Sequence, residues 1–99
     1  MPSGSKKEPG PLSIELGKAL RAKMAREKVT NKALGEAVGM SPSQVSGVLN
    51  AKKNVDVEQL DAMCWSLGLD TLDLLTEVDA ATMDRHIAPD WSARPLIRK

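Results

Sequence analysis

The chain has very few aromatic side chains, with two tryptophans and neither tyrosine nor phenylalanine among its 99 residues. Leu, Val, Met, Ala and Ile must therefore fill the core of what we expect to be a single small domain. Leu, Ala and Met are good helix formers, and few segments are rich in β-branched residues. The composition therefore predicts an all-α fold.

The sequence also lacks the groupings that catalysis and metal binding need. Its one cysteine, Cys64, excludes an internal disulfide and a cysteine-built metal site. No nucleophile–base pair, phosphate loop or cluster of metal ligands is visible, so we expect no enzyme activity, no cofactor and no metal. No apolar run approaches the roughly 20 residues that span a bilayer, and no signal-peptide pattern is present. We expect a cytoplasmic protein without membrane contact.

The net charge of +1 conceals a strong asymmetry along the chain. Residues 1–53 hold ten Lys or Arg against four Asp or Glu, whereas residues 54–99 hold four against nine. One half thus has the charge expected of a surface that meets a polyanion such as DNA. The alternative is that these charges only solvate helix faces.

Composition divides the chain into three parts. Residues 1–12 are rich in Pro, Gly, Ser and Lys and predict a flexible basic arm. Residues 13–79 carry five stretches of helical periodicity and form the predicted domain. Residues 80–99 contain two prolines and predict an extension that is partly helical or disordered.

Capping residues and apolar spacing predict where the five helices begin and which sides they bury. The expected N-caps are Ser13, Thr30, Ser41, Asp56 and Asp70 or Thr71. The expected inward positions are Leu16, Leu20, Met24, Leu34, Ala37, Val38, Val45, Val48, Leu49, Val57, Leu60, Cys64, Leu67, Leu72, Leu75 and Val78.

The strongest pattern is a helix-turn-helix at residues 31–50. Such a unit needs a turn residue that tolerates positive φ, and Gly39 supplies it. It also needs a small residue where the two helices touch, and Gly35 fits there. Apolar residues occupy the fourth, eighth, tenth, fifteenth and eighteenth positions of the unit, namely Leu34, Val38, Met40, Val45 and Val48.

With these residues in place, the sequence resembles the Cro and lambda-repressor-like helix-turn-helix family over about residues 14–78. The segment VTNKALGEAVGMS (residues 29–41) looks like the family's second helix and turn, and SQVSGVLN (residues 43–50) looks like its recognition helix. Residues 60–75, including the LGL of 67–69, are similar to its closing helices. The resemblance implies a five-helix DNA-binding domain and a transcriptional repressor, of Cro-like or immunity type from a phage or mobile element.

Two positions depart from the family pattern. Asn31 stands where glutamine is frequent, and it reaches less far toward a phosphate. Pro42 stands early in the recognition helix, where the family often has a polar base-reading side chain. Because proline offers no donor, base reading must shift to its neighbours.

A recognition helix presents its N-terminal residues to base edges in the major groove, while flanking residues contact phosphates. The predicted base-reading residues are Ser43, Gln44, Ser46 and Gly47. The predicted phosphate contacts are Asn31, Lys32, Ser41, Asn50, Lys52 and Lys53. Lys6 and Lys7 of the arm are expected to reach the duplex as well. For each polar residue the alternative is helix capping or solvation.

One small DNA-binding domain buries too little surface for strong specificity, and a pair of such domains doubles that surface. We therefore expect a homodimer on a pseudo-palindromic operator in double-stranded DNA. Trp65 and Trp91 are the candidate interface residues. Alternatively, Trp65 packs against the C-terminal extension. Two further functions stay open: an antitoxin, or a controller protein of a restriction–modification system, in which the C-terminal segment binds a second protein.

Overall fold

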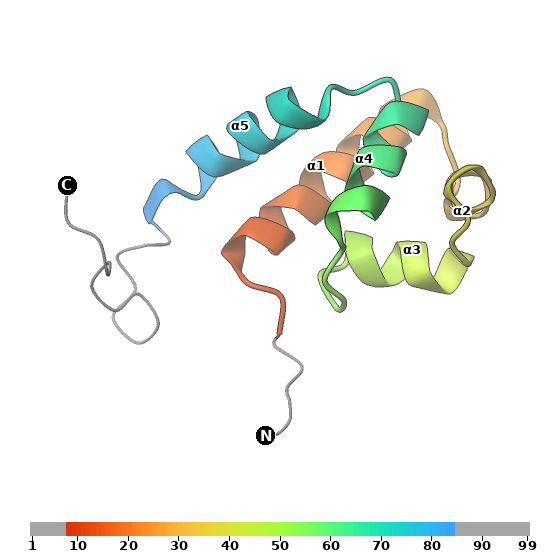
Figure 1. The fold of residues 1–99 in the computed structure, drawn as a ribbon, viewed down its shortest axis with the longest axis horizontal. Coiled ribbons are helices and arrows are strands. Elements are labelled where there is room, and N and C mark those ends of the chain that lie inside the picture. Colours follow the sequence, from red (N-terminus) through yellow and green to blue (C-terminus); the bar gives the residue numbers. More distant parts are fainter. Residues whose placement is uncertain (1–7, 85–99) are drawn as a thin grey trace.

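The computed structural model describes residues 8–84, and this part of the chain is all-α, as predicted. Figure 1 shows α5 alongside α1 and α4 above α3. The main packing pairs are α1 with α3 and α5, α2 with α3 and α4, and α4 with α5. The helices are α1 (Pro11–Glu27), α2 (Asn31–Val38), α3 (Pro42–Leu49), α4 (Val57–Ser66) and α5 (Thr71–Ala81).

The start of α1 differs from the prediction. Ser13 is not its N-cap, because the helix already begins at Pro11, and Gly10 occupies the cap position without a side-chain hydrogen bond. Proline suits the first position of a helix, where no N–H is needed and its fixed φ is helical. The Ser13 hydroxyl instead donates to Oδ1 of Asn54 at 3.5 Å. Pro11, which we expected in the arm, therefore belongs to the first turn of α1.

The other predicted caps are confirmed by their hydrogen bonds. Thr30 Oγ1 accepts from the backbone N–H of Ala33 at 3.0 Å at the start of α2. Asp70 Oδ1 accepts from the N–H of Asp73, also at 3.0 Å, and so begins α5. Each of these bonds satisfies an N–H that has no acceptor within its own helix.

The core is apolar, and most of the predicted inward positions lie in it. Three expectations were wrong. Val57 and Leu72 are 78% and 72% exposed, and Ala37 is also exposed. In α5 the buried positions are Leu74 and Val78, and Leu72 lies on the opposite side of the helix from Leu74. The buried set is Leu16, Leu20, Met24, Leu34, Met40, Val45, Val48, Leu49, Leu60, Met63, Cys64, Leu67, Leu74 and Val78.

Two glycines permit the closest approaches between segments. A Cβ on Gly17 would overlap the carbonyl oxygen of Leu49, where α1 crosses the end of α3. A Cβ on Gly35 would overlap the carbonyl oxygen of Met40, just after the turn that follows α2. Both close approaches therefore depend on the absence of a side chain, and the one at Gly17 sets the position of α3 against α1.

Cys64 is fully buried in α4, and burial raises the pKa of its thiol. The negative charges of Asp61 and Asp70 raise this pKa further, and a hydrogen bond with Thr71 lowers it in part. The thiolate is the reactive form of cysteine. We expect the native chain at pH 8 to react far more slowly with a thiol reagent such as DTNB than the same chain in denaturant. Since Cys64 is the one cysteine, the signal is unambiguous. Native reactivity equal to that of the denatured chain would contradict its placement.

No helix among residues 8–84 has both the length and the apolar content that a membrane crossing requires. The same residues contain no group of three His, Cys, Asp or Glu side chains positioned to hold a metal ion.

Candidate nucleic-acid interface

The turn between α2 and α3 has the predicted construction. Gly39 adopts φ 75° and ψ 31°, and its N–H donates to the carbonyl oxygen of Gly35. The N–H of Met40 donates to the same oxygen at 2.8 Å. The left-handed conformation at Gly39 ends α2 and redirects the chain within three residues, since α3 begins at Pro42.

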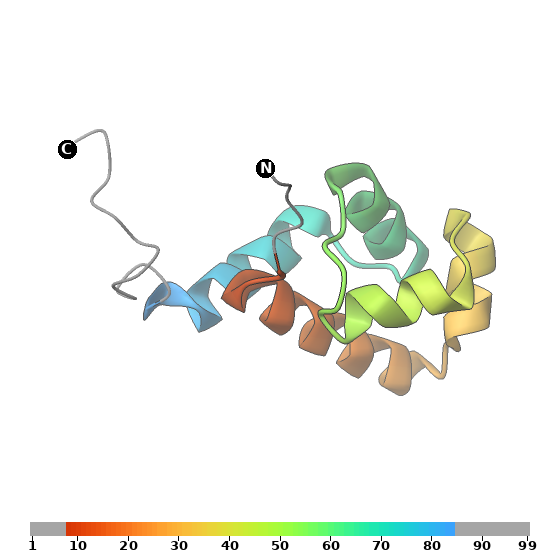
Figure 2. The same ribbon diagram turned by 90° about the horizontal axis from the view of Figure 1, so that it is seen from below.

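The apolar residues predicted for this unit hold the two helices together. Leu34, Met40, Val45 and Val48 are all buried, and Val38 packs half-buried against them. Their burial leaves the polar residues of α3 on its outer side. Figure 2 shows α3 running across the face of the molecule with α2 at one end of it.

The first turn of α3 is closed by a capping box. Ser41 Oγ accepts from the N–H of Gln44 at 3.1 Å, and Gln44 Oε1 accepts from the N–H of Ser41 at 2.8 Å. Both side chains are exposed, as is Ser43 between them. With the box closed, both amide N–H groups of Gln44 and one lone pair of its amide oxygen remain available to a base. A bidentate contact with adenine uses the oxygen as well, which must then accept a second hydrogen bond or leave the box.

Ser46 and Asn50, expected to act separately, are joined in the structure. Asn50 Nδ2 donates to the carbonyl oxygen and to Oγ of Ser46, at 3.0 and 3.1 Å. Asn50 Oδ1 accepts from Nη1 of Arg21 at 3.4 Å. A chain of hydrogen bonds thus runs from α1 through the end of α3 to its middle. Arg21 was absent from the predicted site, because its partner lies 29 residues away.

Gly47 lies beneath the loop that follows α3. The N–H groups of Lys52 and Lys53 donate to its carbonyl oxygen at 2.8 and 3.1 Å. A Cβ on Gly47 would lie 3.1 Å from Cγ and Cδ of Lys53, so the aliphatic part of that side chain covers the glycine. The loop therefore holds two exposed lysines beside the recognition helix.

The remaining predicted site residues are dispersed. Asn31 and Lys32 form the first turn of α2, half-buried and exposed respectively. Lys6, Lys7 and Trp91 lie outside the described residues. Trp65 lies on α4 and is 84% exposed.

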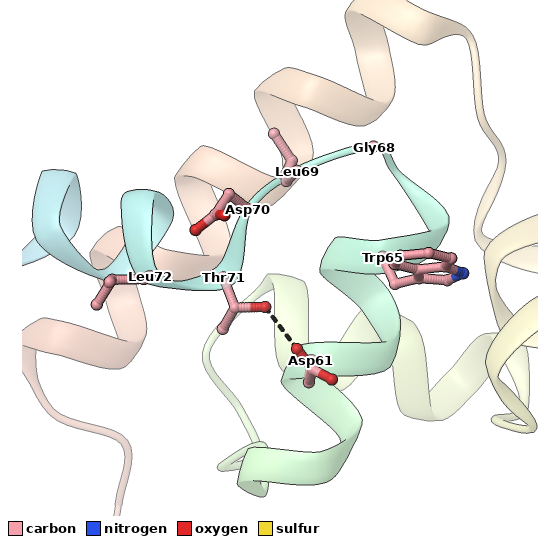
Figure 3. Close-up of a pocket in the computed structure, with 7 residues that line it drawn as sticks. All are labelled: Asp61, Trp65, Gly68, Leu69, Asp70, Thr71 and Leu72. Carbon is pink, nitrogen blue, oxygen red and sulfur yellow. Dashed lines mark hydrogen bonds between the residues drawn. The ribbon is translucent and has the colours of Figure 1, made fainter.

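Trp65 lies beside an open groove of about 620 Å³ at the junction of α4 and α5. In Figure 3 its indole projects from α4, while Leu72 lies at the other side of the groove. Between them, the hydroxyl of Thr71 donates to Oδ1 of Asp61 at 2.8 Å.

The helices that form this groove differ in charge from the part of the molecule that carries the recognition helix. Residues 54–84, which include α4 and α5, carry eight Asp or Glu and no Lys or Arg. All the lysines and arginines of the described residues therefore lie in or beside α1, α2 and α3. Among residues 8–84, the charges that attract a polyanion are therefore confined to the part formed by α1, α2, α3 and the loop after α3.

Comparison with known proteins agrees with this geometry. A family described as "Helix-turn-helix domain" matches residues 15–78. Two crystal structures of the clp gene regulator ClgR from Corynebacterium glutamicum are similar to the chain, each with 35% sequence identity and a TM-score of 0.65. One match covers 72% of this chain and 92% of that one, and the other covers 87% and 97%. No curated protein matches the chain significantly.

The family match spans more than half of the chain, and it contains the turn at Gly39, the capped recognition helix and the closing helices. The chain belongs to the helix-turn-helix domain family of DNA-binding proteins.

Proposed function

We propose that the chain is a sequence-specific transcription regulator that inserts α3 into the major groove of double-stranded DNA and represses by covering a promoter. The observation that carries this proposal is the exposed first turn of α3, with Ser43 and Gln44 at its tip and two lysines in the following loop. The similar protein ClgR is a clp gene regulator, which favours the same class of function. A phage or mobile-element repressor of Cro-like or immunity type fits the resemblance in the sequence.

We propose further that the chain binds as a homodimer on a pseudo-palindromic operator. Two DNA-binding domains that contact sites one DNA turn apart bury twice the surface that one small domain buries against DNA. The exposed side chains of Trp65 and Leu72 support α4 and α5 as the dimer interface, because large apolar side chains, aromatic ones above all, are enriched at the centres of protein–protein interfaces. Trp91 is proposed as a second interface residue, and Lys6 and Lys7 as arm contacts to the duplex.

The test is an electrophoretic shift assay on the gene's own upstream region, with a scrambled duplex of equal composition as competitor. We expect the chain to bind the upstream duplex more tightly than the scrambled duplex by orders of magnitude, as is typical of specific sites over non-specific ones. If the scrambled duplex competed equally well, the proposal of a sequence-specific regulator would be wrong.

A second candidate is an antitoxin or a restriction–modification controller, whose C-terminal segment binds a partner protein. The exposed indole of Trp65 beside an acidic groove favours it, since such a surface suits a protein partner as well as a second copy. Co-purification with one small protein encoded by a neighbouring gene would select this candidate over the phage-type repressor.

A further inference from the structure

Arg21 differs from the other basic residues in the middle of α1. Lys18 and Lys23 each form an ion pair with a glutamate of the same helix, at 3.1 and 3.4 Å. Arg21 forms no ion pair with any carboxylate of residues 8–84, and its one hydrogen bond there goes to Asn50. A guanidinium has five N–H donors, so most of those on Arg21 remain available to a ligand.

Arg21 also lines a cavity of about 380 Å³ that is open to solvent, together with Asn31 and Asn50. Buried Met24 and Leu49 form part of its apolar lining. The cavity is bounded by α1, the start of α2 and the end of α3, the three helices that Figure 2 shows on one side of the molecule. Its polar groups are one guanidinium and two side-chain amides, a set rich in donors without a carboxylate.

We propose that this cavity binds a backbone phosphate of DNA and that Arg21 is its principal donor. The planar fork of a guanidinium matches two phosphate oxygens at once, and Arg–phosphate hydrogen bonds are among the strongest in proteins. With α3 in the major groove, the sugar–phosphate strands pass beside its ends, so a cavity at the end of α3 faces a strand. The inference rests on the proposed DNA binding and adds to it a residue that nothing else assigns.

A purely structural role for Arg21 makes a different prediction. In that case the guanidinium only supports Asn50, and through it Ser46, and it interacts favourably with the carbonyl end of α3. Loss of such a support weakens binding and lowers stability, but it leaves the number of released counterions unchanged. The salt dependence of binding therefore separates the two roles.

The test compares Arg21→Ala with Lys18→Ala. Both variants remove one positive charge from α1, but Lys18 is paired with Glu15 and faces α5. Fluorescence anisotropy would give the Kd on the upstream duplex and on a scrambled duplex over a series of salt concentrations, and thermal unfolding would verify that each variant is folded. We expect Arg21→Ala to bind both duplexes about tenfold more weakly. Its slope of log K against log salt should fall in magnitude by about 0.9.

Lys18→Ala should keep the wild-type slope, and Arg21→Lys should keep the slope while losing part of the affinity, because an ammonium offers the charge without the fork. An unchanged slope for Arg21→Ala would overturn the phosphate site, even with weakened binding, and leave the proposed function intact. Failure of the wild-type chain to bind either duplex would overturn both together.

Discussion

Replacing Gln44 by glutamate will weaken DNA binding about 100-fold or more while leaving the domain folded. Glutamate is the other residue that closes a capping box at this position, so the bond to the N–H of Ser41 should persist. A negative charge in the first turn of α3 also interacts favourably with the helix dipole, by about 0.3–1 kcal/mol. Stability should therefore be unchanged or slightly higher.

The loss on the DNA side has two physical causes. Glutamate removes the amide donors that Gln44 presents to base edges, and a good base contact contributes about 1–3 kcal/mol of discrimination. The new carboxylate also lies at the tip of the helix that enters the groove, where the phosphates repel it. Anisotropy titrations on the upstream duplex would measure the loss, and thermal unfolding would measure the stability.

The chain provides a matched control in α4. Asp56 and Gln59 form the same kind of capping box, with bonds of 2.7 and 3.4 Å, on the acidic side of the molecule. Gln59→Glu makes the identical change in charge and should alter the affinity less than about threefold, because Gln59 lies on α4 and not on the helix that enters the groove, and salt screens the remaining repulsion. Equal losses for the two variants would mean that net charge, and not the position of Gln44 on α3, governs binding.

Gly17→Ala is expected to destabilise the domain by about 2 kcal/mol or more. The added Cβ overlaps the carbonyl oxygen of Leu49 and would lie 3.2 Å from that of Val48. Both are backbone atoms at the end of α3, which cannot move aside without displacing the recognition helix. Overpacking of this kind costs about 1–3 kcal/mol and occasionally more. For a domain of this size the expected fall in Tm is on the order of 10 °C.

Gly47→Ala is the control for this substitution, because it makes the same change in another helix. Its Cβ would meet only the flexible stem of Lys53 at 3.1 Å, which can rotate away. Alanine is favoured over glycine within helices by about 1 kcal/mol, so stability should be maintained or rise. Thermal unfolding followed by circular dichroism would compare the two. A Tm for Gly17→Ala within a few degrees of the wild-type value would show that α1 and α3 can separate without cost.

The sequence predicted the helix boundaries best where the signal is local. Thr30, Ser41 and Asp56 cap their helices through bonds to a residue three positions on, so short-range patterns suffice. The start of α1 was placed wrongly because a capping serine was preferred to a proline at the first helical position. Leu72 was assigned to the core because spacing alone does not show which side of α5 meets α1.

The candidate site was predictable to the extent that it lies within one helix. The exposure of Ser43 and Gln44 follows from the buried side of α3. The capping box was overlooked, although the Ser-x-x-Gln pattern at 41–44 is its ordinary sequence signature. Arg21 could not be found in this way, because its approach to Asn50 depends on the crossing of α1 and α3 at Gly17.

We propose that this helix-turn-helix reads a specific DNA sequence through α3. Selection of preferred sites from a pool of random duplexes, with the full chain as bait, tests it most directly. We predict enrichment of one two-fold-symmetric sequence, with half-sites about one helical turn apart. The same selection with Gln44→Glu should lose that sequence, and the selection with Gln59→Glu should keep it. A wild-type pool that stays as random as the input would contradict the claim.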